Sequence, residues 1–251
     1  MPRFFIDPSA VSGDTVTLMG ENAHHASYSL RLAPGDRISV CDQQTAYTCE
    51  MLSFDGESAT ARILESAPID TEPPFVARLY QALPKGDKLD TVIQKAVECG
   101  AAVITTFESE RCVVRAKDGA EEKKVERRRR IALEAAKQSG RGIIPEVHPT
   151  VSFKEAIRRA SEADIPLFCY EGDGTESLAS VLKHRRTELG ADATPTVSLV
   201  IGSEGGFSQA EAAAAVAAGM HPVGLGKRIL RTETAAAFVL SCLVYELELS
   251  D

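Results

Sequence analysis

Residues 201–208 read Ile-Gly-Ser-Glu-Gly-Gly-Phe-Ser, and residues 225–235 read Leu-Gly-Lys-Arg-Ile-Leu-Arg-Thr-Glu-Thr-Ala. Each stretch lies between an apolar run typical of a strand and a segment typical of a helix. In an open α/β sheet, ligands bind where loops leave the carboxyl ends of the strands. Two glycine-rich loops so close in the sequence therefore predict one shared ligand pocket.

Strands and helices alternate over residues 73–251, which predicts a parallel α/β domain. The helix signals are Gly100 as a left-handed cap and two expected capping boxes, Ser152 with Glu155 and Ser208 with Glu211. We expect strands at 75–82, 102–107, 165–170, 196–201 and 221–225, and helices at 87–99, 120–139, 175–187, 208–219 and 232–248, with a further helix that begins after Ser152.

Residues 1–72 follow a different pattern, because short β-like runs are separated by turn residues such as Asp55-Gly56. These runs, at 4–6, 15–18, 37–41, 46–52 and 59–64, predict a small β-barrel. The segment from Ala67 to Pro74 contains three prolines, which resist helix and sheet and favour an extended connector. We therefore expect two domains, 1–72 and 73–251.

The composition is that of an ordinary globular protein, with 44% hydrophobic and 25% charged residues. No apolar run approaches the roughly 20 residues that span a bilayer, so we expect no membrane segment. The amino terminus has no secretory signal, which favours a cytoplasmic location. The six cysteines are scattered without a C-x-x-C motif, so we expect reduced thiols and no metal site.

Charge is distributed unevenly along the chain, whose total formal charge is -8. Residues 1–72 carry a net charge of -7, residues 78–141 of +5 and residues 142–251 of -6. The basic segment includes the run Arg127–Arg130, which could form an anion-binding face. Charge patterning favours the alternative, a solvated helix face whose arginines pair with Glu121, Glu122 and Glu126.

The glycine loops match neither the phosphate-binding loop G-x-x-x-x-G-K-[ST] nor the dinucleotide fingerprint G-x-G-x-x-G. The three glycines of the first loop leave backbone amides free for a ligand, although a tight turn without a ligand remains an alternative. In the second loop Thr232 and Glu233 could simply cap a helix. Arg231 fits that role poorly, because a cation near a helix N-terminus is unfavourable, so we expect it to contact a ligand.

Taken together, these residues resemble the carboxy-terminal signature of the ribosomal RNA small subunit methyltransferase E family, within the SPOUT superfamily. Several further blocks at fitting separations extend the resemblance over nearly the whole chain. They are Arg3–Phe5, Leu30–Leu32, Pro34–Asp36, Gln94–Gly100, Ser109–Val114, Glu134–Arg141 and Pro145–Val147.

The resemblance implies an α/β fold, with a SPOUT trefoil-knot methyltransferase domain at 73–251 preceded by a PUA-like β-barrel, an RNA-binding domain, at 1–72. It implies a homodimer that binds S-adenosyl-L-methionine and methylates N3 of one uridine in 16S ribosomal RNA of the small ribosomal subunit, without a metal. Two alternatives stay open. One is an RNA-binding or ribosome-assembly factor with this fold, and the other is a methyltransferase that acts on another RNA.

Uridine N3 carries a proton at neutral pH, so its lone pair must be exposed by a base or by stabilisation of the uridine anion. We expect Arg231 with Arg228 to stabilise negative charge on the uracil oxygens, and Glu233 or Glu204 to orient or accept the proton. The expected cofactor-binding residues are Gly202, Glu204, Gly205, Gly206, Leu225, Gly226, Ile229, Leu230, Thr232 and Thr234. Leu230 could instead belong to the core.

Long donors that can reach phosphates or a flipped base are expected to bind RNA. They are Arg3, His25, Arg31, Lys85, Lys88, Arg111, Gln138 and Arg141. The alternatives are that His25 is a plain surface histidine and that Arg111 pairs with Glu108 or Glu110.

Three positions depart from the family pattern. Ser203 stands where the family usually has proline, and Gln43-Gln44 replaces the glycine that usually follows the aspartate of the barrel hairpin. Tyr28-Ser29 replaces a pair that is usually Arg or Lys followed by Val. We expect Ser203 to loosen the first loop without removing its amides. Together with the net charge of residues 1–72, Tyr28-Ser29 predicts weak RNA binding by the first domain.

Overall fold

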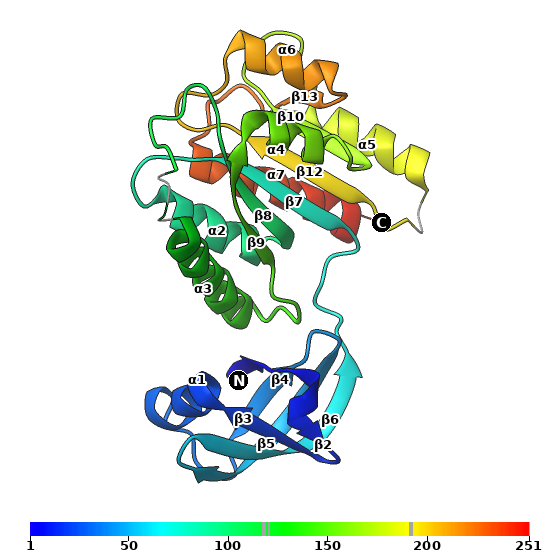
Figure 1. The fold of residues 1–251 in the computed structure, drawn as a ribbon. Helices are drawn as coiled ribbons and strands as arrows, with labels where there is room; N and C mark the ends of the chain where they lie inside the picture. Colours follow the sequence, from blue (N-terminus) through cyan, green and yellow to red (C-terminus); the bar gives the residue numbers. More distant parts are fainter. Residues whose placement is uncertain (117–118, 120, 191–192, 251) are drawn as a thin grey trace. The chain divides into compact units, whose positions relative to one another are not determined.

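The computed structural model describes residues 1–116, 119, 121–190 and 193–250, which fold into two compact units (Figure 1). The first unit comprises Met1–Glu72 together with Ala136–Ile144, and the second comprises Pro73–Ala135 and Pro145–Asp251. Among the described residues no helix is long and apolar enough to cross a lipid bilayer.

The second unit is built on a seven-stranded sheet whose strand order is β11-β13-β10-β12-β7-β8-β9. Every pairing in it is parallel, so the parallel α/β architecture predicted from the sequence is confirmed. The strands are β7 (Val76–Ala82), β8 (Ala101–Glu108), β9 (Glu146–Ser152), β10 (Ile165–Cys169), β11 (Glu176–Ser177), β12 (Thr196–Ile201) and β13 (His221–Gly224).

Helices of this unit connect the strands and cover the sheet (Figure 1). They are α2 (Lys88–Glu98), α3 (Glu121–Ser139), α4 (Phe153–Ala160), α5 (Leu178–Leu189), α6 (Gln209–Ala217) and α7 (Thr232–Val244), which continues into the π-helical turn η3 (Tyr245–Leu249). Helices α2 and α7 pack against each other. The helix expected from residue 175 begins only at Leu178, because Glu176 and Ser177 pair with β13 as strand β11.

The two expected capping boxes differ in the structure. At α6 the Ser208 hydroxyl accepts from the Glu211 backbone N–H, and the Glu211 carboxylate accepts from the Ser208 N–H, so this box is complete. At α4 the Ser152 hydroxyl accepts from the Glu155 N–H, but the Glu155 carboxylate pairs with Arg158 and Arg159 instead. The Ser152 prediction is therefore correct for the cap and wrong for the reciprocal bond.

Aromatic rings fill the core beneath the carboxyl end of the sheet. Phe207, which follows β12, is 4% exposed and packs against Phe168 of β10 with ring centroids 4.4 Å apart. It also stacks on Phe107 of β8, at 6.3 Å, so the first glycine loop is joined to the core through this ring. Burial of a phenylalanine side chain contributes roughly 1.5–3 kcal/mol.

The arginine run of α3 is not the uniformly solvated face expected from charge patterning. Arg130 is exposed and pairs with Glu126, and Arg127 pairs with Asp90. Arg128 is instead 5% exposed, and its guanidinium donates to the Glu121 carboxylate at 3.0 Å. A buried guanidinium needs such a partner because desolvation of an unpaired charge is costly.

The first unit is a curled, mixed six-stranded sheet of order β1-β4-β5-β6-β3-β2 (Figure 1). The β1–β4 pair is parallel and the other pairs are antiparallel. Its core contains Phe4, Leu18, Ile38 and Met51. The elements are β1 (Arg3–Phe5), η1 (Pro8–Ala10), β2 (Val11–Ser12), β3 (Thr15–Met19), α1 (Gly20–His24), η2 (His25–Ser29), β4 (Arg37–Cys41), β5 (Thr45–Asp55) and β6 (Ser58–Pro68). The expected connector thus begins later than predicted, because Ala67 and Pro68 still pair with β5.

Residues 136–144 return to this first unit through polar contacts. The buried Arg141 guanidinium donates to the Glu72 carboxylate, and the Gly142 N–H donates to the same carboxylate at 3.0 Å. Arg3 donates to the carbonyl oxygens of Gly140 and Arg141. Arg3 and Arg141 were both expected to contact RNA, but these bonds engage their side chains inside the unit. We therefore withdraw Arg141, which is 5% exposed, from the RNA-binding set.

Candidate functional site

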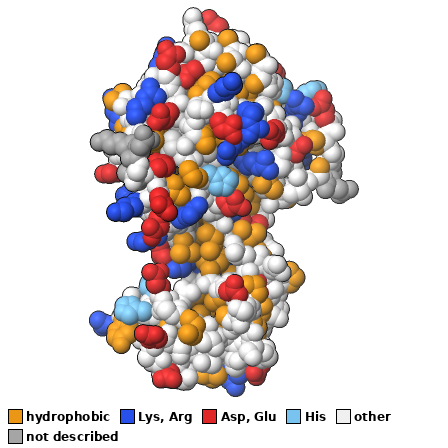
Figure 2. Space-filling view, viewed as in Figure 1, with side chains coloured by type: hydrophobic (Ala, Val, Ile, Leu, Met, Phe, Trp, Pro, Cys, Tyr) orange, Lys and Arg blue, Asp and Glu red, His pale blue; other side chains and the backbone are white. Residues whose placement is uncertain are grey.

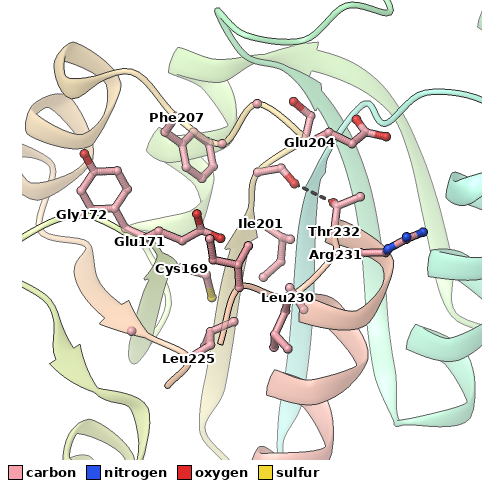
Figure 3. Close-up of a pocket in the computed structure, with 18 of the residues that line it drawn as sticks. Cys169, Glu171, Gly172, Ile201, Glu204, Phe207, Leu225, Leu230, Arg231 and Thr232 are labelled. Carbon is pink, nitrogen blue, oxygen red and sulfur yellow. Dashed lines mark hydrogen bonds between the residues drawn. The ribbon is translucent and has the colours of Figure 1, made fainter. Parts of the chain in front are cut away.

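A cavity of about 810 Å³ opens at the carboxyl ends of strands β10, β12 and β13 (Figure 3). Strands β8 and β9 extend the sheet on one side of β7. The later strands β12, β10 and β13 extend it on the other side. Such a reversal of strand order leaves a crevice between loops that lead in opposite directions. The volume suits a small organic ligand, for which pockets usually measure about 300–1,000 Å³.

The first glycine loop forms one wall of the cavity as a tight turn. The Gly206 N–H donates to the Ser203 carbonyl oxygen at 2.9 Å, and Gly206 has a φ of +61°, where a side chain would be strained. At Gly202 an added Cβ would lie 3.2 Å from the Gly206 Cα and 3.2 Å from the Phe207 ring. The turn at Ser203 is therefore closed by a backbone hydrogen bond and by tight packing.

The second glycine loop forms the opposite wall. Gly226 has a φ of +100°, and Leu225 and Leu230 present apolar side chains toward the cavity (Figure 3). Leu230 thus lines the cavity, and the alternative that it belongs only to the core is wrong. Ile229 also lines the cavity, but 83% of its surface is exposed.

Thr232 links the two walls. Its hydroxyl donates to the Gly202 carbonyl oxygen at 2.6 Å, the bond drawn as a dashed line at Thr232 in Figure 3. The same hydroxyl accepts from the Gln81 side-chain amide at 2.9 Å. The expectation that Thr232 caps the last helix is wrong, because Arg231 occupies the N-cap and Thr232 is the first residue of α7. Thr232 is 6% exposed, so this link is almost dry and its hydrogen bonds are correspondingly important.

A third loop completes the cavity and was missed in the sequence. It follows β10 and contributes Tyr170, Glu171, Gly172 and Thr175, next to Cys169 at the end of that strand. The carboxylate of Glu171 points into the cavity, toward the side where Ile201 and Phe207 lie (Figure 3). The sequence does contain a signal for this loop. Two acidic residues that alternate with two glycines, Glu171-Gly172-Asp173-Gly174, directly follow a predicted strand. Burial raises the pKa of the Cys169 thiol to about 12, so it is neutral at physiological pH.

Cations gather in the wall and around the opening. Lys227, Arg228 and Arg231 are exposed residues of the second loop, and Arg231 lies beside the first turn of α7. Its backbone carbonyl accepts from the Thr234 and Ala235 N–H groups, which fixes the position of the residue. A group of guanidinium and ammonium ions at a cavity opening attracts an anionic partner.

Glu204 lies among these cations and is held by two lysines. Its carboxylate accepts from the Lys88 ammonium at 2.7 Å and from the Lys85 backbone N–H at 3.1 Å. Partial burial raises the pKa of Glu204, but these hydrogen bonds outweigh it and hold the pKa below its ordinary value. Glu204 is therefore an ionised, weakly basic group that fixes the first loop to the loop after β7.

Arg111 reaches the same loop from the segment after β8. Its guanidinium donates to the Gly205 carbonyl oxygen at 3.1 Å, and Arg111 lines the cavity. The alternative that it pairs with Glu108 or Glu110 is wrong for Glu108, because Glu108 pairs with Arg115. A Cβ at Gly205 would lie 3.0 Å from the Arg111 Cβ, so this glycine is required for the close approach of the two loops.

The structure brings most of the expected site residues together. The cavity wall contains Gly202, Glu204, Gly205, Gly206, Leu225, Gly226, Ile229, Leu230 and Thr232 from the expected cofactor set, Arg228 and Arg231 from the catalytic set, and Lys88 and Arg111 from the RNA-binding set. Glu233 and Thr234, in the first turn of α7, are not among the residues that line this wall.

The remaining RNA-binding candidates lie elsewhere. Lys85 is exposed next to the cavity residue Lys88, and Gln138 is exposed near the end of α3. In the first unit Arg31 is exposed, whereas His25 is half-buried with its ring edge-on to Phe4 at 6.1 Å. The alternative of a plain surface histidine is therefore wrong for His25.

Comparison with known proteins agrees with this geometry. Residues 71–244 match the family model described as the RNA methyltransferase domain. Ribosomal RNA small subunit methyltransferase E of Bacillus subtilis is 33% identical over 253 residues, a match that covers 99% of this chain and 98% of the relative. The protein of the same name from Synechocystis is 32% identical, with 95% of this chain and 76% of the relative covered.

Solved structures give the same result. Ribosomal RNA small subunit methyltransferase E of Neisseria gonorrhoeae, bound to S-adenosyl methionine, superposes with a TM-score of 0.83 at 30% identity and covers 97% of each chain. A methyltransferase from Legionella pneumophila with the same cofactor gives a TM-score of 0.82 at 29% identity, over 96% of each chain. The fold and the cavity thus define an RNA methyltransferase. Within that class, the chain belongs to the ribosomal RNA small subunit methyltransferase E family.

Proposed function

We propose that the protein transfers a methyl group from S-adenosyl-L-methionine to N3 of one uridine in 16S ribosomal RNA of the small ribosomal subunit. The observation that carries the proposal is the cavity itself, in which both glycine loops converge and Thr232 links them beneath a group of cations. Relatives named ribosomal RNA small subunit methyltransferase E, one of them with S-adenosyl methionine bound, support the cofactor and the class of RNA.

The residues of the cavity fit the cofactor. Leu225, Leu230 and Ile201 provide an apolar wall for a flat base, and the glycine backbones leave room for the ribose and polar groups. The Ser203 hydroxyl is buried and has no hydrogen-bond partner among the described residues. A buried polar atom of this kind is costly unless something pairs with it, so it suits a ligand with polar groups.

The chemistry divides between the cofactor and the chain. Bound S-adenosylmethionine supplies an electrophilic methyl group, so the protein's task is alignment and electrostatic stabilisation. Arg231, assisted by Arg228, stabilises negative charge on the uracil oxygens and thereby favours the N3 anion. Glu204 orients Lys88 and the first loop rather than accepting the proton, because its lowered pKa makes it a weak base. Glu233, whose buried carboxylate oxygen has no hydrogen-bond partner among the described residues, orients or accepts the N3 proton.

We assign RNA contacts on the second unit to Lys85, Lys88 and Arg111, which lie in or beside the cavity wall. The exposed Gln138, near the end of α3, adds a contact from the first unit. On the first unit, residues 1–72 act as a PUA-like RNA-binding domain through Arg31, with Arg3 and His25 in supporting positions. Phosphate contacts by these cations make the affinity fall as the salt concentration rises.

We further propose that residues 73–251 form a trefoil knot and a homodimer in the cytoplasm. The crossing that supports the knot is the segment between β13 and α7, which passes the end of β12 before α7 packs beside α2. Exposed apolar side chains on α7 and η3, such as Phe238 and Tyr245, support self-association of this unit.

The decisive experiment is to incubate the full-length protein with methyl-labelled S-adenosylmethionine and small ribosomal subunits from a strain that lacks the modification. We expect label in one uridine of 16S ribosomal RNA, located by nuclease mapping and assigned to N3 by mass spectrometry. Cofactor binding without any transfer would overturn the proposal in favour of an RNA-binding or assembly factor. Label in a different RNA would assign another substrate.

A further inference from the structure

An exposed pair of stacked rings marks the helical segment of the first unit. The His24 ring, at the end of α1, lies on the Tyr28 ring of η2 with centroids 4.6 Å apart and an interplanar angle of 26°. Tyr28 is 66% exposed, so one face of this pair is open to solvent. Figure 2 shows histidine, hydrophobic and basic side chains gathered at the edge of this unit, where Figure 1 places α1.

The backbone holds these rings outward. His24 and His25 are adjacent, yet the His25 ring packs inward on Phe4 while the His24 ring faces solvent. The π-helical turn η2 closes through the Leu30 N–H, which donates to the His25 carbonyl oxygen at 2.9 Å. Turns of this type are rare and occur often at functional sites. Arg31, an exposed residue just after the Leu30 cap of this turn, has a φ of +53°, which is uncommon for a residue with a side chain.

The negative charge of the first unit favours RNA binding through an aromatic ring over binding through phosphate contacts. Residues 1–72 carry a net charge of -7 and residues 136–144 of +2, so this unit, at -5, is poorly suited to hold a phosphate backbone by electrostatics alone. A tyrosine ring binds a nucleobase by stacking, which depends neither on net charge nor on base identity.

We propose that Tyr28, supported from behind by His24, is a stacking platform for an unpaired base of the RNA substrate. The proposal rests on the proposed function and assigns its RNA contact in the first unit to an aromatic ring. Because a base inside a duplex cannot offer its face, the platform binds single-stranded nucleotides and not paired ones.

The chain offers a clean fluorescent test because it contains no tryptophan. The full-length Tyr28→Trp variant carries one indole at the platform, and a stacked base quenches indole emission. We expect a single-stranded oligouridine to quench it and an RNA duplex of equal length to leave it unchanged. Equal quenching by both, or none by either, would overturn the proposal.

A second test separates stacking from charge. Binding of a single-stranded RNA fragment of 16S ribosomal RNA to Tyr28→Ala should weaken by about 5-fold or more, with an unchanged slope of affinity against salt. Tyr28→Phe should bind like the parent, because it keeps the ring. Arg31→Ala is the matched control, since loss of a phosphate contact lowers the salt slope itself.

The outcomes also distinguish this proposal from the proposed function. If the parent protein methylates ribosomal RNA and Tyr28→Ala binds the fragment as tightly as the parent, the platform is wrong and the function stands. If the parent neither binds nor methylates RNA, the function itself fails. Thermal unfolding and cofactor affinity of Tyr28→Ala should match the parent, because the side chain is largely exposed.

Discussion

The hydroxyl of Thr232 donates a 2.6 Å hydrogen bond to the carbonyl oxygen of Gly202, across 30 residues of chain. This bond joins the start of the last helix to the first glycine loop, and the Gln81 amide donates to the same hydroxyl. Thr232→Val keeps the shape of the side chain but removes two hydrogen bonds from a nearly dry site, although the Gln81 amide keeps its bond to the Ala82 carbonyl oxygen. We expect a loss of about 1–3 kcal/mol in the free energy of unfolding, together with weaker cofactor binding. Chemical denaturation and calorimetry measure the two effects, and Thr232→Ser, which retains the hydroxyl, should restore most of both.

Arg231 is expected to act on the reaction more than on the fold. Its guanidinium is exposed beside the cavity, so Arg231→Ala should leave thermal unfolding nearly unchanged. Methyl transfer at saturating cofactor should fall about 100-fold to 1000-fold, the loss typical when one donor to a developing oxyanion is removed. Arg130→Ala removes a guanidinium that is 74% exposed on α3 and is the matched control. A near-parental rate for Arg231→Ala would remove this residue from the mechanism.

The Glu204–Lys88 pair should give the second unit an acid-sensitive contribution to stability. The pKa of Glu204 is held below its ordinary value of 4.5, so the folded state binds the proton less well than the unfolded state. The contribution is therefore complete above that ordinary value and disappears as the pH falls through the lowered pKa. The difference in melting temperature between the parent and Glu204→Gln should stay constant from about pH 7 to pH 5 and shrink below it. A difference that grows in acid would contradict the assignment.

Glu171 should distinguish the cofactor from its product by charge. S-adenosylmethionine carries a positive sulfonium that S-adenosylhomocysteine lacks, and the Glu171 carboxylate points into the cavity (Figure 3). We expect Glu171→Gln to weaken binding of S-adenosylmethionine by roughly 10-fold, the scale of one charged interaction, and to leave binding of S-adenosylhomocysteine nearly unchanged. Titration calorimetry with both ligands gives the comparison. Equal losses for both would show that Glu171 does not sense the sulfonium.

Local patterns were enough to predict the parallel sheet and two of the three loops around the cavity. The strand at 196–201 and the capping box of Ser208 with Glu211 agree with the structure because each depends on neighbours within a few residues. Strand β9 was missed because it lies at the sheet edge and contains Pro149, a residue that signals against a strand. Strand β11 has two residues, which is too short for any periodic signal.

Contacts between distant parts of the chain could not be predicted in this way. The Arg141 side chain offers the same donors to a phosphate as to a carboxylate, and nothing near it in the sequence indicates that Glu72 takes them. Thr232 likewise has the local appearance of a helix cap, and only the fold shows that its hydroxyl reaches Gly202 instead. The loop at Glu171 is different, because it follows a predicted strand and the rule that identified the other two loops applies to it as well.

The return of residues 136–144 to the first unit has a consequence for the order in which the molecule matures during translation. A ribosome delivers residues 1–72 early, yet the guanidinium that neutralises Glu72 and the Gly140 carbonyl that receives Arg3 arrive only after most of α3 has been made. Amino-terminal domains usually fold as soon as they emerge. The first unit of this protein can instead complete its contacts only after residues 136–144 have been synthesised and have packed against residues 1–72.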